Sequence, residues 1–106
     1  MTDLSIWPET IKEAVEQMID TMSEEDKMEL VNTKPDSIYR FQYSLVLLIC
    51  GWFGLYNGNK ALLAACANTR KNEIEHIIFL YDPEKASVII IEAIRKRLRT
   101  DLKVPV

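Results

Sequence analysis

The chain has 106 residues, of which 48% are hydrophobic and 27% charged, and its net charge is −3. This composition is ordinary for a globular protein and excludes a largely disordered chain, and the length fits one domain, which we expect to span residues 1–106. The longest apolar run, residues 44–56, is shorter than the roughly 20 residues of a transmembrane helix, so we expect no association with a membrane.

The N-terminus and the cysteines indicate a cytoplasmic protein. The residues Met1-Thr2-Asp3 do not form a basic region ahead of an apolar one, so no secretory signal is expected. Two cysteines, Cys50 and Cys66, are too few for a disulfide framework, and both lie among apolar residues. We therefore expect buried, reduced thiols and no cofactor. A zinc site needs more ligands than these cysteines and the single histidine, His76, supply.

The charges are distributed unevenly along the chain. Residues 1–36 contain ten acids and three lysines, whereas residues 84–106 contain six bases and three acids. An acidic surface repels nucleic acid and attracts cationic proteins. We therefore expect a protein partner and no nucleic acid.

The first two predicted helices are acidic. Apolar residues recur at helical spacing from Ile11 to Met22. Pro8 suits the first turn of this helix, and Thr10 followed three residues later by a glutamate offers a second possible start as a capping box. Ser23 begins a second helix because its hydroxyl can accept the amide hydrogen three residues on. Pro35 ends this second helix, since proline cannot continue the hydrogen-bond ladder.

The third predicted helix, about residues 37–53, is apolar on nearly all sides. A helix of this kind is typical of a central element packed on several sides. The fold that we predict is therefore all-α, a single domain of five to six helices around this central helix. Its residues at helical spacing are expected in the core: Ile38, Phe41, Leu45, Leu48, Ile49 and Trp52.

A glycine- and asparagine-rich turn follows. Gly54 and Gly58 tolerate positive φ, and an Asn-Gly pair favours a turn. Asn59 is placed to cap a fourth helix, residues 60–68. An alternative interpretation is a small polar site formed by the turn from Tyr56 to Asn59.

The C-terminal part of the chain contains two further predicted helices. Residues 74–81 fit a short helix, although their β-branched side chains also fit a strand; we prefer the helix because no second strand exists to pair with it. Asp82 followed by proline predicts a sharp helix start. The last helix runs to about Arg99, and the tail, residues 100–106, is expected to be frayed.

Several short motifs along the chain resemble those of an uncharacterised family of small bacterial and phage-encoded domains. Members open with Trp-Pro and a short acidic helix. A Ser/Gly-Leu segment then leads into Ile-Arg-Asn, followed by Phe-Gly-Leu-Trp, an Asn or Gly-Asn pair and Leu-Leu. They close with an Asp-x-x-(Ala)-Ser helix start and an aliphatic run. The matching residues are Trp7-Pro8, Ser44-Leu45, Ile49, Phe53-Gly54-Leu55-Tyr56, Gly58-Asn59, Leu62-Leu63, Cys66, Asp82, Ala86-Ser87 and Ile90-Ile91.

The resemblance covers most of the chain and implies a helical fold, with no known reaction. One departure concerns the Arg-Asn pair after Ile49, which is Cys50-Gly51 here. If that polar pair does chemistry or binds a ligand in the family, this chain has lost the function.

No catalytic constellation accompanies these motifs. His76 has no nucleophile motif near it in the sequence. The glycine spacing matches no phosphate-binding loop, and the acids at the start of the second helix are expected for capping alone. We therefore predict that the protein is not an enzyme.

The leading functional hypothesis is a bacterial immunity protein or antitoxin that neutralises a cationic toxin by direct binding. It is expected to be a monomer or a weak homodimer. One alternative is a phage or mobile-element inhibitor of a host defence protein. Another is a small-ligand binder or enzyme that uses the turn from Tyr56 to Asn59. The acids expected to contact the partner are Glu13, Glu16, Asp20, Glu24, Glu25 and Glu29.

Overall fold

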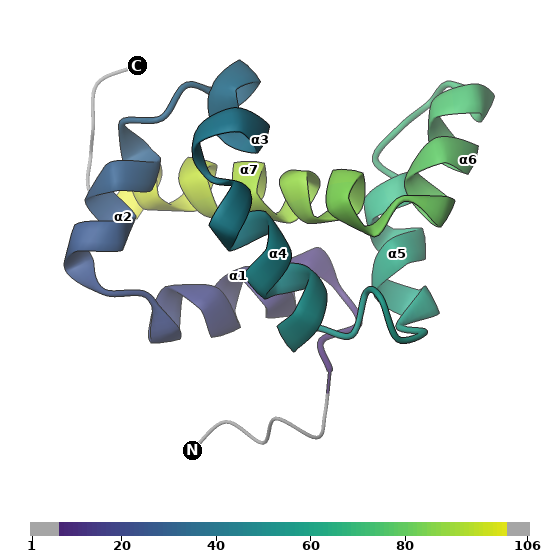
Figure 1. The fold of residues 1–106 in the computed structure, drawn as a ribbon, viewed down its shortest axis with the longest axis horizontal. Helices are drawn as coiled ribbons and strands as arrows, with labels where there is room; N and C mark the ends of the chain where they lie inside the picture. The colour runs from purple at the N-terminus through teal and green to yellow at the C-terminus, as the bar shows by residue number, and fades with distance from the viewer. Residues whose placement is uncertain (1–6, 102–106) are drawn as a thin grey trace.

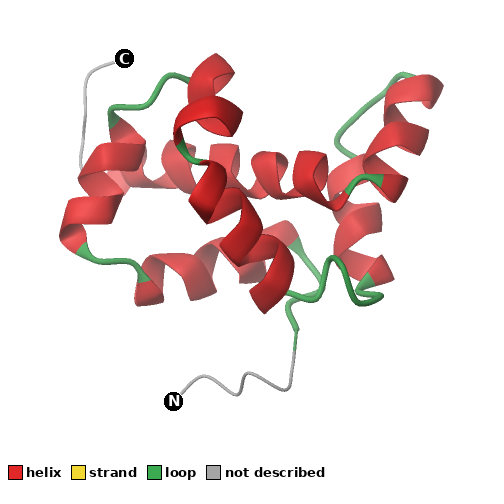
Figure 2. Ribbon diagram, in the orientation of Figure 1, coloured by secondary structure: helices red, strands yellow, loops and turns green. Residues whose placement is uncertain are grey.

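The computed structural model describes residues 7–101, and all regular structure in that range is helical (Figures 1 and 2). The elements in chain order are α1 (Ile11–Thr21), α2 (Glu24–Val31), a 3-10 turn (Pro35–Ser37), α3 (Ile38–Phe41), α4 (Tyr43–Trp52), α5 (Lys60–Ala67), α6 (Glu73–Tyr81) and α7 (Pro83–Asp101). The all-α prediction is confirmed. The described residues form seven α-helices rather than five to six, because the predicted helix over residues 37–53 is divided in two.

The division occurs at Gln42, between α3 and α4. The backbone of Gln42 leaves the helical region, with φ −121° and ψ 31°. Its side chain is buried, and the amide Nε2 donates a hydrogen bond of 3.1 Å to Thr33 Oγ1 in the loop after α2. A buried amide with a partner stabilises this bend, because the same group without one would carry a desolvation penalty.

The bend changes which apolar residues are buried. Ile38 and Ile49 lie in the core as predicted, and Leu45 packs against it. Phe41 and Trp52 do not: their side chains are 63% and 43% exposed, and Leu48 is exposed as well. The prediction that these three residues are buried is wrong, since two short helices at an angle cannot present one continuous stripe to the core.

The centre of the fold is α7, not the segment over residues 37–53. Helix α7 packs against all six other α-helices, and Figure 1 shows it passing behind α4 between the two ends of the molecule. With 19 residues it is about 28 Å long, nearly the 34 Å of the longest dimension of the fold. No other described helix is long enough to contact elements at both ends, so the interior forms around α7.

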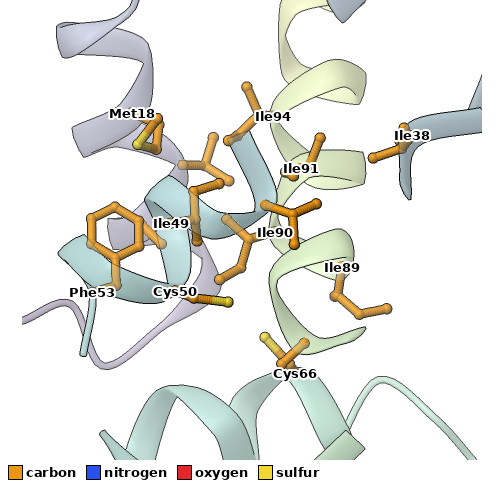
Figure 3. Packing of buried hydrophobic residues seen from close by; sticks show 14 of the residues in the cluster. Met18, Ile38, Ile49, Cys50, Phe53, Cys66, Ile89, Ile90, Ile91 and Ile94 are labelled. Atoms are coloured by element: carbon orange, nitrogen blue, oxygen red, sulfur yellow. The ribbon is translucent and has the colours of Figure 1, made fainter. Parts of the chain in front are cut away.

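The buried face of α7 is mostly isoleucine. Figure 3 shows Ile90 and Ile94 on the side of α7 towards Met18 of α1 and Ile49 of α4, and Ile91 on the side towards Ile38 of α3. The residues of α7 that are buried are Ala86, Ser87, Ile89, Ile90, Ile91, Ile94 and Leu98. Within residues 7–101, no helix combines the length and the apolar character needed to cross a membrane.

Capping hydrogen bonds confirm four predicted helix starts, and of the two possible starts of α1 the structure has Thr10 rather than Pro8. In each, a side-chain oxygen accepts the N–H three residues on; the capping residues are Thr10, Ser23, Asn59 and Asp82. A fifth cap, Asn72, was not predicted: its Oδ1 accepts the N–H groups of Ile74 and Glu75 at the start of α6. The preference for a helix over residues 74–81 is confirmed. Helix α7 extends to Asp101, and the rest of the predicted frayed tail, residues 102–106, lies outside the described residues.

Candidate functional site

The six acids predicted to contact a partner are all exposed. Glu13, Glu16 and Asp20 follow a spacing of three and four residues on α1, which places them on one side of that helix, opposite its buried face. Glu24, Glu25 and Glu29 are exposed on α2. We refer to these six residues as the acidic surface.

The charges of the acidic surface are mostly unneutralised by the chain itself. Residues 9–29 contain eight acids but only two lysines. Within the described part of the chain, the only ion pair that involves the acidic surface joins Lys27 Nζ to Glu24 Oε1 at 3.4 Å. At the cationic end of α7, Arg95 Nε donates to the Thr33 carbonyl oxygen in the loop after α2, and Arg97 pairs with Asp101 on its own helix.

A groove of about 430 Å³ lies between α1 and α2 on one side and α3 and α4 on the other. We refer to it as the α2–α4 groove. Met22 and Leu45 contribute apolar surface that is partly buried, and the exposed side chains of Phe41, Leu48 and Trp52 extend this apolar lining. Two carboxylates of α2 line the same groove, those of Asp26 and Glu29. Of the six predicted acids, only Glu29 therefore lies at the groove.

Sequence reasoning missed this groove because it assigned the apolar residues after Ile38 to the core. The signal that was available is Gln42, a polar residue in the middle of the apolar segment. A chain of this length also has only one small interior, and α7 already fills it.

A second polar cluster surrounds Glu84, in the first turn of α7. Its Oε1 accepts a hydrogen bond of 2.8 Å from Tyr39 Oη, and its Oε2 accepts one of 3.4 Å from Tyr56 Oη. The hydrogen bond to Glu84 raises the pKa of Tyr39 to about 12, because losing the phenolic proton would set a second negative charge against the carboxylate. The Tyr39 ring also meets the Tyr43 ring edge to face, with 5.3 Å between ring centroids. The cluster joins α3 and the turn before α5 to the start of α7.

An open cleft of about 510 Å³ adjoins this cluster, between α6 and α7. Arg70 lines it and stacks its guanidinium on the Phe79 ring, 4.8 Å from the ring centroid. Three carboxylates and the Lys85 ammonium line the rest; the carboxylates belong to Asp82, Glu84 and Glu92. Three carboxylates against two cations leave the lining of the cleft with one net negative charge, far less one-sided than the acidic surface.

The turn from Tyr56 to Asn59 joins two parts of the chain. It is the turn that the alternative interpretation treats as a ligand site. The buried Asn59 amide donates from Nδ2 to the carbonyl oxygens of Pro8 at 2.9 Å and Phe53 at 2.7 Å, while its Oδ1 caps α5. Gly54 has φ +69°, and the Trp7 indole lies so close that a side chain at Gly54 would collide with it. The Trp-Pro and Phe-Gly-Leu-Tyr motifs therefore meet in space, and every hydrogen-bonding atom of the Asn59 side chain is engaged within the chain.

The remaining candidate residues, His76 and the two cysteines, make contacts within the fold. His76 Nδ1 lies 3.2 Å from the Ala67 carbonyl oxygen. Cys50 and Cys66 are free and buried, as predicted, and burial raises the pKa of the Cys66 thiol to about 12, which disfavours the reactive thiolate. Among residues 7–101, no group of three or more His, Cys, Asp or Glu side chains is placed to hold a metal ion.

A family model described as a domain of unknown function (DUF6794) matches residues 7–98. The chain belongs to this family. The match begins at Trp7 and extends to Leu98 on the buried face of α7, so it includes both halves of the joint between Trp7, Gly54 and Asn59. No curated protein and no solved structure matched the chain. The bacterial or phage origin inferred from the resemblance stays a prediction.

Proposed function

We propose that the protein is a non-enzymatic, cytoplasmic binding protein whose acidic surface contacts a cationic protein, and that this partner is a bacterial toxin neutralised in the complex. The observation that carries the proposal is the set of exposed carboxylates on α1 and α2. Five of the six form no ion pair within residues 7–101. Acids in the first turn stabilise a helix, which accounts for Glu13, Glu24 and Glu25. Glu16, Asp20 and Glu29 lie beyond the first turn, and charges left in solvent contribute little to folding, so these three acids require another explanation.

An unneutralised acidic surface acts most strongly on the rate of association. Complementary charge raises association rate constants from about 10⁵–10⁶ M⁻¹s⁻¹ towards 10⁸–10⁹ M⁻¹s⁻¹ at low salt. An inhibitor of a toxin must bind before the toxin finds its target, so a fast encounter has direct value. Nuclease-type toxins carry cationic clefts that bind nucleic acid, and a carboxylate surface resembles the phosphates such a cleft accepts.

The test begins with capture of the partner from the native host on the immobilised protein, followed by purification of the captured protein. Association is then measured by stopped flow at several salt concentrations for the wild type and for the quadruple variant Glu16→Gln/Asp20→Asn/Glu25→Gln/Glu29→Gln. The wild-type rate is expected to fall steeply with salt, because screening weakens the attraction. The variant is expected to associate at least about tenfold more slowly at low salt and with a flatter salt dependence.

The matched control changes charge elsewhere. Lys96→Gln/Arg97→Gln alters two exposed residues of α7 and leaves the acidic surface intact, so its association rate should stay within about twofold of the wild type or rise with the more negative net charge. Expression of the captured protein in a host cell should arrest growth, and co-expression of the wild type should restore it. An acidic partner, an unchanged rate for the quadruple variant or a harmless partner would each contradict the proposal.

A further inference from the structure

The α2–α4 groove exposes large apolar side chains that the fold does not cover. Phe41 is 63% exposed and Trp52 is 43% exposed, and Leu48 lies with them along the same groove. Contiguous exposed apolar surface on a small protein marks an interaction site. Aromatic side chains are also the commonest anchors of protein interfaces.

The charged groups that line this groove are all acidic. Asp26 and Glu29 line it from α2, and no lysine or arginine is among its lining residues. Two cations are next to lining residues in the sequence, Lys27 and Arg40, and neither lines the groove. Lys27 pairs with Glu24, and the Arg40 guanidinium stacks on the Phe41 ring at 5.2 Å from the centroid. An occupant that complements this lining combines apolar side chains with flanking positive charge.

The walls of the groove are helices, with α1 and α2 on one side and α4 on the other. A helix that enters such a groove can present apolar anchors at spacings of three, four and seven residues. We infer that the α2–α4 groove receives a basic amphipathic helix of the partner, with its apolar face against Phe41, Leu48 and Trp52 and its lysines or arginines against Asp26 and Glu29. This inference rests on the proposed function and names the part of the partner that binds.

A second copy of this chain does not fit the groove as well. The basic residues of the chain gather at the end of α7, but the apolar face of that helix is buried, Ile94 and Leu98 included. Helix α6 has exposed apolar residues but begins with Glu73 and Glu75, and these would meet like charges at the groove. Neither α6 nor α7 is therefore both basic and free on its apolar face.

The experiment uses the full chain and a synthetic peptide of leucine and lysine patterned as a basic amphipathic helix. Titration calorimetry gives the dissociation constant, and tryptophan fluorescence reports contact, since Trp52 lines the groove. Leu48→Arg places bulk and positive charge in the groove and is expected to weaken binding about tenfold or more. Leu47→Arg is the matched control: Leu47 is the residue before Leu48 on α4, 41% exposed against 39% for Leu48, and it does not line the groove.

Two more measurements locate the peptide. The peptide should shift the tryptophan emission of the wild type and of Leu47→Arg to the blue, and Trp52→Phe should bind the peptide while losing most of that shift. A peptide with glutamate in place of lysine should bind at least about tenfold more weakly, because it meets Asp26 and Glu29. If circular dichroism shows that Leu48→Arg does not fold, Phe41→Ser replaces it, since Phe41 is the most exposed aromatic residue of the groove.

The inference is overturned if Leu48→Arg and Leu47→Arg bind equally, if the glutamate peptide binds as tightly as the lysine peptide, or if the wild type dimerises through the groove in sedimentation experiments and Leu48→Arg does not. Its failure is distinguishable from failure of the proposed function. If the captured partner responds to the quadruple charge variant but not to Leu48→Arg, the acidic surface acts without the groove. If neither variant affects it, both proposals fail.

Discussion

Helices α6 and α7 are joined by the single residue Asp82, and both are rich in isoleucine, yet they differ in how far their side chains are buried. Helix α7 buries seven residues, whereas none of the residues of α6 is fully buried. Ile74, Ile77 and Ile78 of α6 are exposed, and Tyr81 is 82% exposed. Apolar content therefore does not decide which helix forms the interior.

The difference follows from position. Figure 1 shows α6 at one end of the molecule beside α5, while α7 runs through the middle. Helix α6 packs mainly against α5 and to a smaller extent against α7. Helix α7, in contrast, packs against all six other α-helices. A helix at the edge of a small fold has neighbours on one side only, so half of its surface faces solvent whatever its sequence.

The largest expected effect contrasts one isoleucine from each helix. Ile90→Ala in α7 removes a fully buried side chain and should reduce the free energy of unfolding by about 2–5 kcal/mol, because the surrounding core cannot close the cavity. Ile77→Ala in α6 makes the same chemical change at an exposed position and should cost about 0.5 kcal/mol or less. Urea denaturation of both variants measures the contrast, and equal losses would show that α6 is as deeply packed as α7.

A smaller effect compares the asparagine caps of α5 and α6. Asn59→Ala removes the cap of α5 and leaves the carbonyl oxygens of Pro8 and Phe53 without their donor, so we expect a loss of about 2–3 kcal/mol. Asn72→Ala removes only an exposed cap of α6 and should cost about 1 kcal/mol. Thermal unfolding followed by circular dichroism measures both. If Asn72→Ala reduced stability more than Asn59→Ala, the cap of α6 would matter more to the fold than the hydrogen bonds that Asn59 forms with Pro8 and Phe53.

The smallest effect concerns the contact between α3 and the start of α7. The pKa of Tyr39 is raised from its ordinary value of 10 to about 12, first by its hydrogen bond to Glu84. Because the folded state holds this proton more tightly than the unfolded state, the stabilisation is complete below pH 10 and is lost as the pH rises towards about 12.

Glu84→Gln removes the negative charge and should bring the titration of Tyr39 back towards pH 10, as followed by the absorbance of tyrosinate. Tyr81→Phe on α6 is the control, since Tyr81 is exposed and the carboxylate of Glu84 accepts its hydrogen bonds from Tyr39 and Tyr56 instead. This variant should leave the high-pH step in place. A titration curve that Glu84→Gln does not change would contradict the assignment of the hydrogen bond as the cause.

Much of the fold and part of the candidate site could be predicted from local sequence. Helical spacing identified α1, α2, α5, α6 and α7, and the caps at Ser23 and Asn59 follow from side chains that reach an amide three residues away. The exposure of Glu16 and Asp20 also followed from spacing, since apolar residues occupy the opposite side of α1. These are interactions within one turn of helix, so neighbouring residues determine them.

The sequence by itself determined where α1, α2, α5 and α7 begin and which side of α1 is acidic. Only the tertiary structure decided that α7 occupies the centre, that Gln42 turns to Thr33, and that Asn59 bonds to Pro8, 51 residues earlier. The physical reason is that the periodicity of a sequence identifies the apolar face of each helix separately. Whether that face is buried depends on how the other helices pack, because all of them share one small interior. The exposed apolar side chains of the α2–α4 groove are the surface that this competition left uncovered.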